Sequence, residues 1–240
     1  MTAGVHGARP GTLGTPRLHL RITDSTNIRA RELAAAGAPH GTLVTAAEQS
    51  AGRGRQGRVW SAPAGRALLC SLVIRRPPRL LALAAGVAVA ETVGADSVVK
   101  WPNDVLVHDR KVAGILTEGR PQEDWSVLGI GINVALGVAE LPPELRDTAG
   151  TLGLGAEAIE PTLTALLSAL TRWVTAPAEV VTAAVRRRDA LLDRPVSWTG
   201  GTGTGAGIDD EGRLLVAMGD RRVALNAGEV HLADLRSPVR

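Results

Sequence analysis

Residues 97–116 read SVVKWPNDVLVHDRKVAGIL, and this stretch decides the fold. Residues 97–100 have the apolar content of a buried strand, and Pro102 fixes a turn directly after it. Two more apolar runs, 105–107 and 112–116, predict a hairpin whose turn is formed by Asp109 and Arg110. A strand that runs into a proline turn and a hairpin is typical of the strand ends where α/β proteins place their sites.

This hairpin is expected to return Lys111 to a position alongside Asn103 and Asp104. Only Lys100 and Lys111 are lysine among the 27 basic residues, so the other cations are arginine. The abundance of Ala, Gly and Arg indicates a coding bias under which lysine drifts to arginine. Two lysines that persist eleven positions apart are therefore candidates for a functional role rather than ordinary surface charges.

The pattern outside this stretch predicts a mixed α/β domain followed by a small all-β module. Strands are expected at 17–23, 41–47, 67–74 and 125–134, and helices at about 27–36, 80–93, 162–175 and 178–192. After Pro195 only short strand-like pieces occur, separated by glycine-rich turns, and we interpret the glycine tract 200–205 as one such turn. The expected organisation is a flexible tail over 1–16, a main domain over 17–194 and a C-terminal domain over 195–240.

Composition excludes several classes of protein. A chain of 240 residues with 45% hydrophobic and 21% charged residues is an ordinary globular sequence. The single Cys70 excludes a disulfide framework and a cysteine-rich zinc site, and its apolar surroundings predict a buried structural thiol. The longest apolar run, 80–90, is shorter than the roughly 20 residues that span a bilayer, so we expect a cytoplasmic protein without membrane contact.

The segment 52–58, GRGRQGR, satisfies the pattern G-x-G-x-x-G, but its context argues against a dinucleotide site. No apolar helix follows it, and Arg75 and Arg76 lie where an acidic residue would be required. Its glycines allow close approach of the backbone, and its arginines can bind phosphate or carboxylate through two hydrogen bonds each. We expect a loop that is mobile when empty and closes over an anion. An arginine–glycine RNA contact is the rival interpretation, although Trp60 is the only ring nearby.

A third candidate is the run 129–134, GIGINV. Its two glycines lie on one face of a strand and would let another group press flat against the backbone, while Asn133 offers a donor and an acceptor. The sequence contains no G-x-S-x-G motif and no histidine with a plausible Ser/Asp constellation, so a hydrolase triad is not expected.

Taken together, these segments resemble the biotin–protein ligase, or biotin–[acetyl-CoA-carboxylase] ligase, family. Residues 24–27 look like its S-T-N helix start, and Gln49 with 52–60 looks like its G-R-G-R-x-G-R-x-W loop. Residues 100–104 match K-W-P-N-D, 110–116 match R-K-x-x-G-I-L, and 129–134 match G-I-G-I-N-V. Order and spacing agree over residues 17–134.

The resemblance implies a mixed-sheet catalytic domain related to class II aminoacyl-tRNA synthetases and lipoate ligases, plus an SH3-like C-terminal β-barrel. It implies that biotin and Mg-ATP form biotinyl-5′-AMP, and that a lysine of the biotin carboxyl carrier protein then takes the biotinyl group. The chain would be a short form without a DNA-binding domain, so no DNA partner is expected.

The resemblance also implies roles for particular residues. The catalytic group comprises Arg53, Arg55, Lys100 and Lys111. The biotin-binding group comprises Ser25, Thr26, Asn27, Gln49, Arg53, Gly54, Arg55, Lys111 and Gly114. The ATP- and adenylate-binding group comprises Arg58, Trp60, Lys100, Asn103, Asp104 and Asn133, with Asp104 as the candidate Mg²⁺ ligand.

Two alternatives and one departure remain. A lipoate or octanoate ligase or transferase on the same fold is the nearest alternative, and a dinucleotide-dependent oxidoreductase is a distant one. The departure lies in the loop 136–154, which has no aromatic residue to cover an adenylate. Either the Leu and Val side chains of this loop cover the adenylate, or Trp60, the ring that we expect to stack on adenine, covers more of it.

Overall fold

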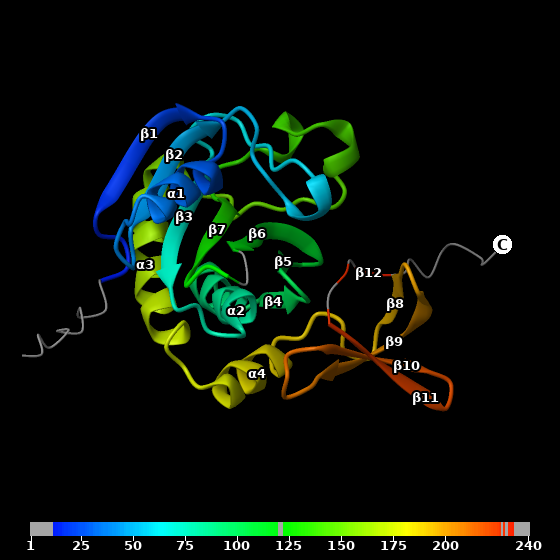
Figure 1. Ribbon diagram of the computed structural model, residues 1–240. Helices are drawn as coiled ribbons and strands as arrows, with labels where there is room; N and C mark the ends of the chain where they lie inside the picture. Colours follow the sequence, from blue (N-terminus) through cyan, green and yellow to red (C-terminus); the bar gives the residue numbers. More distant parts are fainter. Residues whose placement is uncertain (1–11, 120–121, 227, 229, 233–240) are drawn as a thin grey trace, which may run out of the picture.

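The structure is a computed structural model that describes residues 12–119, 122–226, 228 and 230–232. Its larger sheet has seven strands in the order β1-β2-β3-β7-β6-β5-β4 (Figure 1). The strands are β1 (Arg17–Thr23), β2 (Leu43–Gln49), β3 (Ala67–Arg75), β4 (Ser97–Lys100), β5 (Asp104–Val107), β6 (Arg110–Gly119) and β7 (Trp125–Asn133). The pair β1–β2 is parallel and the other pairs are antiparallel, so the expected mixed sheet is confirmed.

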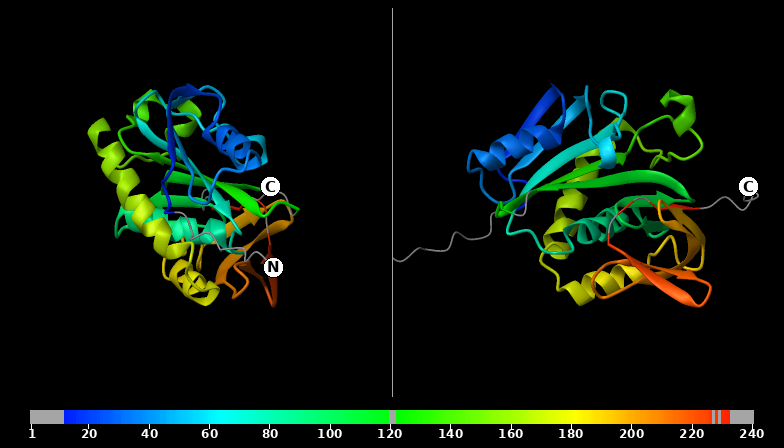
Figure 2. Two further views of the ribbon diagram at one scale, coloured as in Figure 1. Left: turned by 60° about the vertical axis from the view of Figure 1, so that its left-hand side comes forward. Right: turned by 45° about the vertical axis from the view of Figure 1, so that its right-hand side comes forward.

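Helices cover both faces of this sheet. Helix α1 (Thr26–Ala35) packs on β2, β3 and β7, while α2 (Leu81–Val93) packs on β4, β5 and β6. Helix α3 (Ile159–Trp173) contacts β3 and α2, and α4 (Ala178–Arg186) also contacts α2. Figures 1 and 2 show α1 and α2 on opposite sides of the strands. The described residues also form four short 3-10 helices: η1 (Arg55–Gly57), η2 (Val138–Glu140), η3 (Pro143–Leu145) and η4 (Ala156–Ala158).

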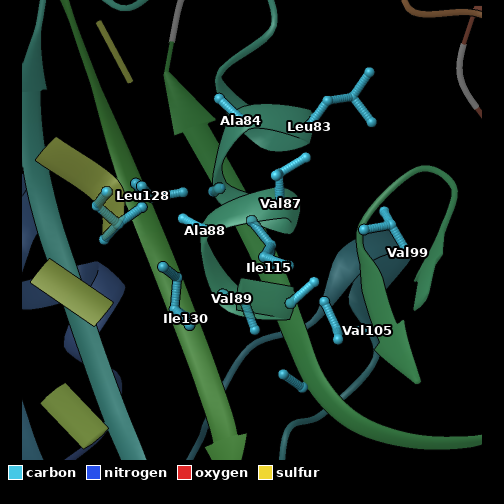
Figure 3. Close-up of a cluster of buried hydrophobic side chains, with 14 of the residues drawn as sticks. Leu83, Ala84, Val87, Ala88, Val89, Val99, Val105, Ile115, Leu128 and Ile130 are labelled. Atoms are coloured by element: carbon cyan, nitrogen blue, oxygen red, sulfur yellow. The ribbon is translucent and has the colours of Figure 1, made fainter. Parts of the chain in front are cut away.

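The main core lies between the sheet and α2, where small side chains allow close packing. Helix α2 reads LALAAGVAVAETV, and nine of its residues are buried. A Cβ at Gly86 would lie 3.3 Å from Val99 Cγ1, so the helix approaches β4 closely at this point. Leu128 and Ile130 of β7 meet α2 from the sheet side (Figure 3). A core almost without rings is therefore built from Ala, Val, Leu and Ile at close range.

A second, five-stranded antiparallel sheet follows α4 in the chain. Its strands are β8 (Pro195–Trp198), β9 (Gly201–Ile208), β10 (Leu214–Met218), β11 (Arg221–Leu225) and β12 (His231–Leu232), in the order β11-β10-β9-β8-β12. Its buried side chains belong to the same hydrophobic cluster as α2. In addition, Trp101 Nε1 donates to the Gly212 carbonyl at 3.0 Å. The two sheets therefore share one continuous core.

The glycine tract 200–205 is not the turn that we predicted, because most of it forms β9. Close backbone approach explains the glycines. A Cβ at Gly203 would lie 2.4 Å from the Ala217 carbonyl oxygen, and one at Gly205 would lie 1.9 Å from the Leu191 carbonyl oxygen. Glycine here permits contact between backbones, and the sequence pattern alone does not distinguish this from turn formation.

Helix α4 ends at Arg186, six residues before the predicted end at 192. The chain beyond it pairs with the edge strand β4 instead of continuing the helix. Val99 N donates to the Arg188 carbonyl at 2.7 Å, and Ala190 N donates to the Val99 carbonyl at 3.0 Å. Pairing with β4 satisfies backbone groups that would otherwise remain exposed at the edge of the sheet.

Residues 12–16, which we expected in the flexible tail, lie against the main domain. Leu13 is buried in the main core, and Gly14 N donates to the Gly41 carbonyl at 2.9 Å. The rest of the expected tail, 1–11, lies outside the described residues. Within the described ranges, no helix combines the length and the apolar character needed to cross a membrane.

Candidate active site

Strand register brings the predicted residues onto one face of the large sheet. One cross-strand row joins Leu69 of β3, Gly131 of β7, Gly114 of β6 and Asp104 of β5. The neighbouring row on the same face joins Ser71, Gly129 and Leu116. Because side chains alternate across a strand, every second residue of each segment points to this face.

Helix α1 covers only part of this face, and the glycines leave room on the remainder. Side chains of the protein already use this room. A Cβ at Gly129 would lie 2.0 Å from Asn27 Oδ1, and a Cβ at Gly131 would lie 2.5 Å from Trp60 Cε2. The predicted flat surface therefore exists, with Asn27 pressed on one part of it and the Trp60 indole on another.

A cavity of about 670 Å³ lies over this surface. Its volume is that of a site for a small molecule or cofactor. Loops around 53–61 and 141–149 contribute to the wall, and both lie on the α1 side of the sheet (Figure 2). Six cationic and three acidic side chains line the cavity, so it favours an anionic ligand.

All fifteen residues that the sequence singled out line this one cavity. They are Ser25, Thr26, Asn27, Gln49, Arg53, Gly54, Arg55, Arg58, Trp60, Lys100, Asn103, Asp104, Lys111, Gly114 and Asn133. They come from segments more than 100 positions apart in the chain. We call Ser25, Thr26, Asn27 and Gln49 the polar end, and Arg55, Arg58, Lys100 and Lys111 the cationic end.

The polar end is built on the start of α1 and the last residue of β2. Ser25 is the N-cap, but its side chain makes no capping hydrogen bond. Gln49 of β2 caps the helix in its place, because Gln49 Oε1 accepts a hydrogen bond from Thr26 N at 2.7 Å. β2 extends two residues beyond the predicted strand, and this extension brings Gln49 to the helix.

Asp24 belongs to the turn before α1 rather than to the cavity. The Ser25 backbone N–H, followed by the Arg29 guanidinium, holds the pKa of Asp24 below its ordinary value. Hydrogen bonds to the ionised form have this effect on a carboxyl group. Asp24 therefore stays ionised and fixes the turn from which Ser25 and Thr26 enter the cavity.

The cationic end joins the arginine loop to the β4–β5 turn and the β5–β6 hairpin. Arg55 Nη1 donates to Asn103 Oδ1 at 3.0 Å, and Asn103 Nδ2 donates to the Ile115 carbonyl at 3.1 Å. Lys111 Nζ lies 2.7 Å from Asp104 Oδ1, which confirms that the hairpin returns Lys111 to this turn.

Trp60 lies between the two ends. Its Nε1 is buried and has no hydrogen-bond partner among the described residues, and Lys111 Nζ lies 5.6 Å from the ring centroid. Asn133 is buried, and its Nδ2 donates to the Gly150 carbonyl at 2.8 Å. This bond holds the loop after β7 in place and uses one donor that we had assigned to adenine, so the adenine role of Asn133 stays a prediction.

The sequence reasoning missed several contributors. Ser71 and Glu118 lie behind the polar end, and both hydrogen-bond to Asn27. Arg194 and His231 line the cavity from the C-terminal part of the chain. Glu118 lies in the same conspicuous segment as Lys111 and could have been noticed there, whereas no sequence pattern places residues 194 and 231 at the site.

Cys70 is the buried thiol that the sequence predicted. It is 1% exposed, and burial raises its pKa to about 12. At pH 8 the group is therefore the unreactive thiol form. We expect an aromatic disulfide reagent to leave the folded protein unmodified and to react with one equivalent in denaturant. Reaction of the folded protein at the rate of a free cysteine would contradict this prediction.

The side chains of the cavity fit a Mg²⁺ ion only when nucleotide phosphates supply most of its ligands. In the described part of the chain, no group of three or more His, Cys, Asp or Glu could hold a metal ion. Asp104 is a single carboxylate, largely buried and beside Lys111. One carboxylate together with phosphate oxygens and waters is a common arrangement for Mg²⁺.

The chain is similar in sequence to proteins of a known family. Residues 19–134 match the Biotin/lipoate A/B protein ligase family. A Bacillus subtilis protein named bifunctional ligase/repressor BirA is 39% identical over 162 residues, which are 62% of this chain and 50% of that protein, so the chain spans about half the length of this relative. A Mycobacterium tuberculosis protein named biotin–[acetyl-CoA-carboxylase] ligase is 35% identical over 87% of this chain and 85% of its own.

A solved structure shows the same fold. The biotin protein ligase of Aquifex aeolicus, in complex with biotin and ATP, has a TM-score of 0.78 at 26% identity and covers 91% of this chain and 100% of its own. The fold and the site thus define a protein of the biotin/lipoate ligase class. The chain belongs to this family, among its biotin protein ligases.

Proposed function

We propose that the protein is a cytoplasmic ATP-dependent ligase that attaches biotin to a lysine of the biotin carboxyl carrier protein of acyl-CoA carboxylases. The observation that carries the proposal is the joining of the polar end and the cationic end in one cavity. The names of its relatives and the ligands of the Aquifex structure support the choice of biotin and ATP.

In the first half-reaction, a carboxylate oxygen of biotin bonds to the α-phosphorus of ATP while the bond to the β-phosphate oxygen breaks. The products are biotinyl-5′-AMP and pyrophosphate. Both reactants are anions, so their approach requires fixed positive charge. Arg53, Arg55 and Lys111 line the cavity and supply this charge.

Each substrate has a place along the cavity in this proposal. Ser25, Thr26, Asn27 and Gln49 hold the ureido ring, and Gly114 lies beside the valeryl chain. Lys100, Asn103 and Arg58 face the polyphosphate, where Asp104 would hold Mg²⁺ that neutralises part of the phosphate charge. Trp60 stacks on adenine and Asn133 contacts its edge. The unpartnered Trp60 Nε1 beside the cationic end supports a ligand contact at this ring.

In the second half-reaction, the deprotonated amine of the carrier lysine bonds to the carbonyl carbon of the mixed anhydride, and AMP leaves. Water would destroy the same anhydride, so the site must exclude it in the meantime. The loop 52–58 is held as a narrow turn by a bond from Gly54 N to the Arg58 carbonyl at 2.7 Å. We infer that this loop is the lid, with Arg55 latching it to Asn103.

ATP–pyrophosphate exchange with biotin, lipoate or octanoate as the acid tests the proposal. We expect exchange with biotin and none with the other two acids. Exchange that depends on lipoate alone would identify a lipoate ligase, and binding of RNA without any exchange would remove the protein from enzymes of this class.

Replacing Arg55 with glycine is expected to release the intermediate. Without the bond to Asn103 the lid opens more often, so free biotinyl-AMP should dissociate at least about tenfold faster, the factor that corresponds to the loss of one charged hydrogen bond. Gel filtration of enzyme loaded with labelled biotin and ATP measures this. Arg76→Gly is the control, because Arg76 lies in an exposed turn with φ +50. Equal retention by wild type and Arg55→Gly would exclude the latch.

We also propose that the second sheet is the SH3-like domain of the family and that the domains divide as 17–194 and 195–240. The five antiparallel strands that begin at Pro195 support this division. Residues 233–240 lie outside the described part of the chain.

A further inference from the structure

A chain of buried polar groups runs behind the polar end of the cavity. Glu118 Oε2 accepts from Asn27 Nδ2 at 2.8 Å, and Asn27 Oδ1 lies 2.6 Å from Ser71 Oγ. Ser71 Oγ lies 2.8 Å from Thr26 Oγ1, which faces the cavity. Ser71, Asn27 and Thr26 are each at most 4% exposed, so water does not offer them alternative partners.

The donor hydrogens of these side chains give the series of hydrogen bonds a direction. The Glu118 carboxylate can only accept, so Asn27 must present its NH₂ group to it and its oxygen to Ser71. Asn27 Oδ1 can also only accept, so the single hydroxyl proton of Ser71 is committed to it. The contact between Ser71 and Thr26 still requires a proton, which must come from Thr26.

This assignment leaves Thr26 Oγ1 with lone pairs toward the cavity. Its proton could alternatively point to Gln49 Oε1, but that contact is longer, at 3.1 Å, and Gln49 Oε1 already accepts from Thr26 N. Each donor in the chain therefore points away from the cavity and toward Glu118. Thr26 Oγ1 therefore faces the cavity as a hydrogen-bond acceptor, and its proton is not available to a ligand.

We propose that Glu118 and Ser71 are positioning residues that fix Thr26 Oγ1 as a hydrogen-bond acceptor, so that the polar end selects a ligand with an N–H group. This inference rests on the proposed function, since the ureido ring of biotin carries such groups. The dithiolane ring of lipoate carries none, and a buried acceptor left without a donor weakens binding. We call the hydrogen-bonded series from Glu118 through Asn27 and Ser71 to Thr26 the relay. It would thus distinguish biotin from acids such as lipoate that lack an N–H group.

Glu118 also reaches the arginine loop. Its Oε1 lies 3.2 Å from Arg53 Nη1 and 3.9 Å from Arg31 Nη1. These two cations hold the Glu118 carboxylate in place, as the relay requires. Because Glu118→Gln changes the Arg53 contact as well, Ser71→Ala is the cleaner variant for the relay alone.

The test compares biotin with its two carbamate analogues, in which one or the other ureido N–H is replaced by oxygen. Calorimetric titration of wild type is expected to show that one analogue binds at least about tenfold more weakly than biotin. In Ser71→Ala and Glu118→Gln the Thr26 hydroxyl can turn and donate to the ring oxygen. The ratio of the two affinities should therefore fall below about threefold, while the affinity for biotin itself falls.

Glu32→Gln is the matched control, because Glu32 lies on the exposed side of α1 with Arg29 as its partner, and it should keep the wild-type ratio. The affinity ratio is unaffected by a general loss of stability, which thermal unfolding measures separately. Equal binding of biotin and both carbamates by wild type would overturn the relay, as would an unchanged ratio in both variants. A wild-type protein that binds no biotin would instead overturn the proposed function.

Discussion

The Lys111→Arg variant is expected to lose biotin-dependent ATP–pyrophosphate exchange by about 100- to 1,000-fold, the cost of removing one preorganised donor from a developing charge. Lys111 Nζ is fixed by Asp104 at 2.7 Å. Space for its stem comes from Gly114, where a Cβ would lie 3.2 Å from Lys111 Cε and 2.8 Å from Trp60 Cζ3. The wider guanidinium does not fit there without moving the indole.

Arg110→Lys provides a matched control one position away. Arg110 does not line the cavity, and its Nη1 donates to the Arg146 carbonyl. Exchange by this variant should stay within about twofold of wild type, as surface substitutions usually do. If Lys111→Arg retained near-normal exchange, positive charge alone would be sufficient and the argument from lysine geometry would be wrong.

The second large effect is expected from Gly129→Ala, which should weaken biotin binding by about 100-fold. The added Cβ would lie 2.0 Å from Asn27 Oδ1, so the Asn27 side chain must move and lose its bonds to Ser71 and Glu118. Two buried hydrogen bonds at about 1–3 kcal/mol each account for an effect of this size. Neither Gly129 nor Gly131 has a positive φ, so only the clash is at issue.

Gly131→Ala is the companion variant on the same face of the same strand. Its Cβ would lie 2.5 Å from Trp60 Cε2, so it displaces the indole rather than Asn27. We expect biotin affinity within about threefold of wild type and an increase of at least about tenfold in KM for ATP. Equal effects of the two variants on both substrates would show that the two parts of the cavity are not separable.

Much of the fold follows from local pattern. The apolar runs of β3 and β7, the apolar content of α2 and the proline turn at 102 predict the large sheet because each is decided within a few residues. The end of α4 could not be predicted, since pairing of 188–190 with β4 decides it from 90 positions away. The strand β9 could not be predicted for a similar reason. Its glycines are required because the backbones of other segments approach them closely.

The site was more predictable than the fold around it. Lysine, asparagine and glutamine are scarce in this chain, so their positions at 49, 100, 103, 111 and 133 carried information. The residues behind them were not predictable. Ser71 lies in an apolar strand, and the partners of Glu118, which are Asn27, Arg31 and Arg53, come from segments distant in the sequence. A role that depends on a partner distant in sequence leaves no local signal.

The two cross-strand rows under the cavity have a consequence for ligand length. Ser71 and Gly129 lie in one row, and Leu69 and Gly131 lie in the next row on the same face. Rows of one face are separated by two residues, about 7 Å along the strands. The spacing of the rows therefore sets the distance between the two parts of the cavity. If the ring of an acid is held at Asn27, as proposed, its carboxylate must lie at least one such interval away to meet Lys111. We therefore expect the site to exclude acids whose chains are shorter than this interval.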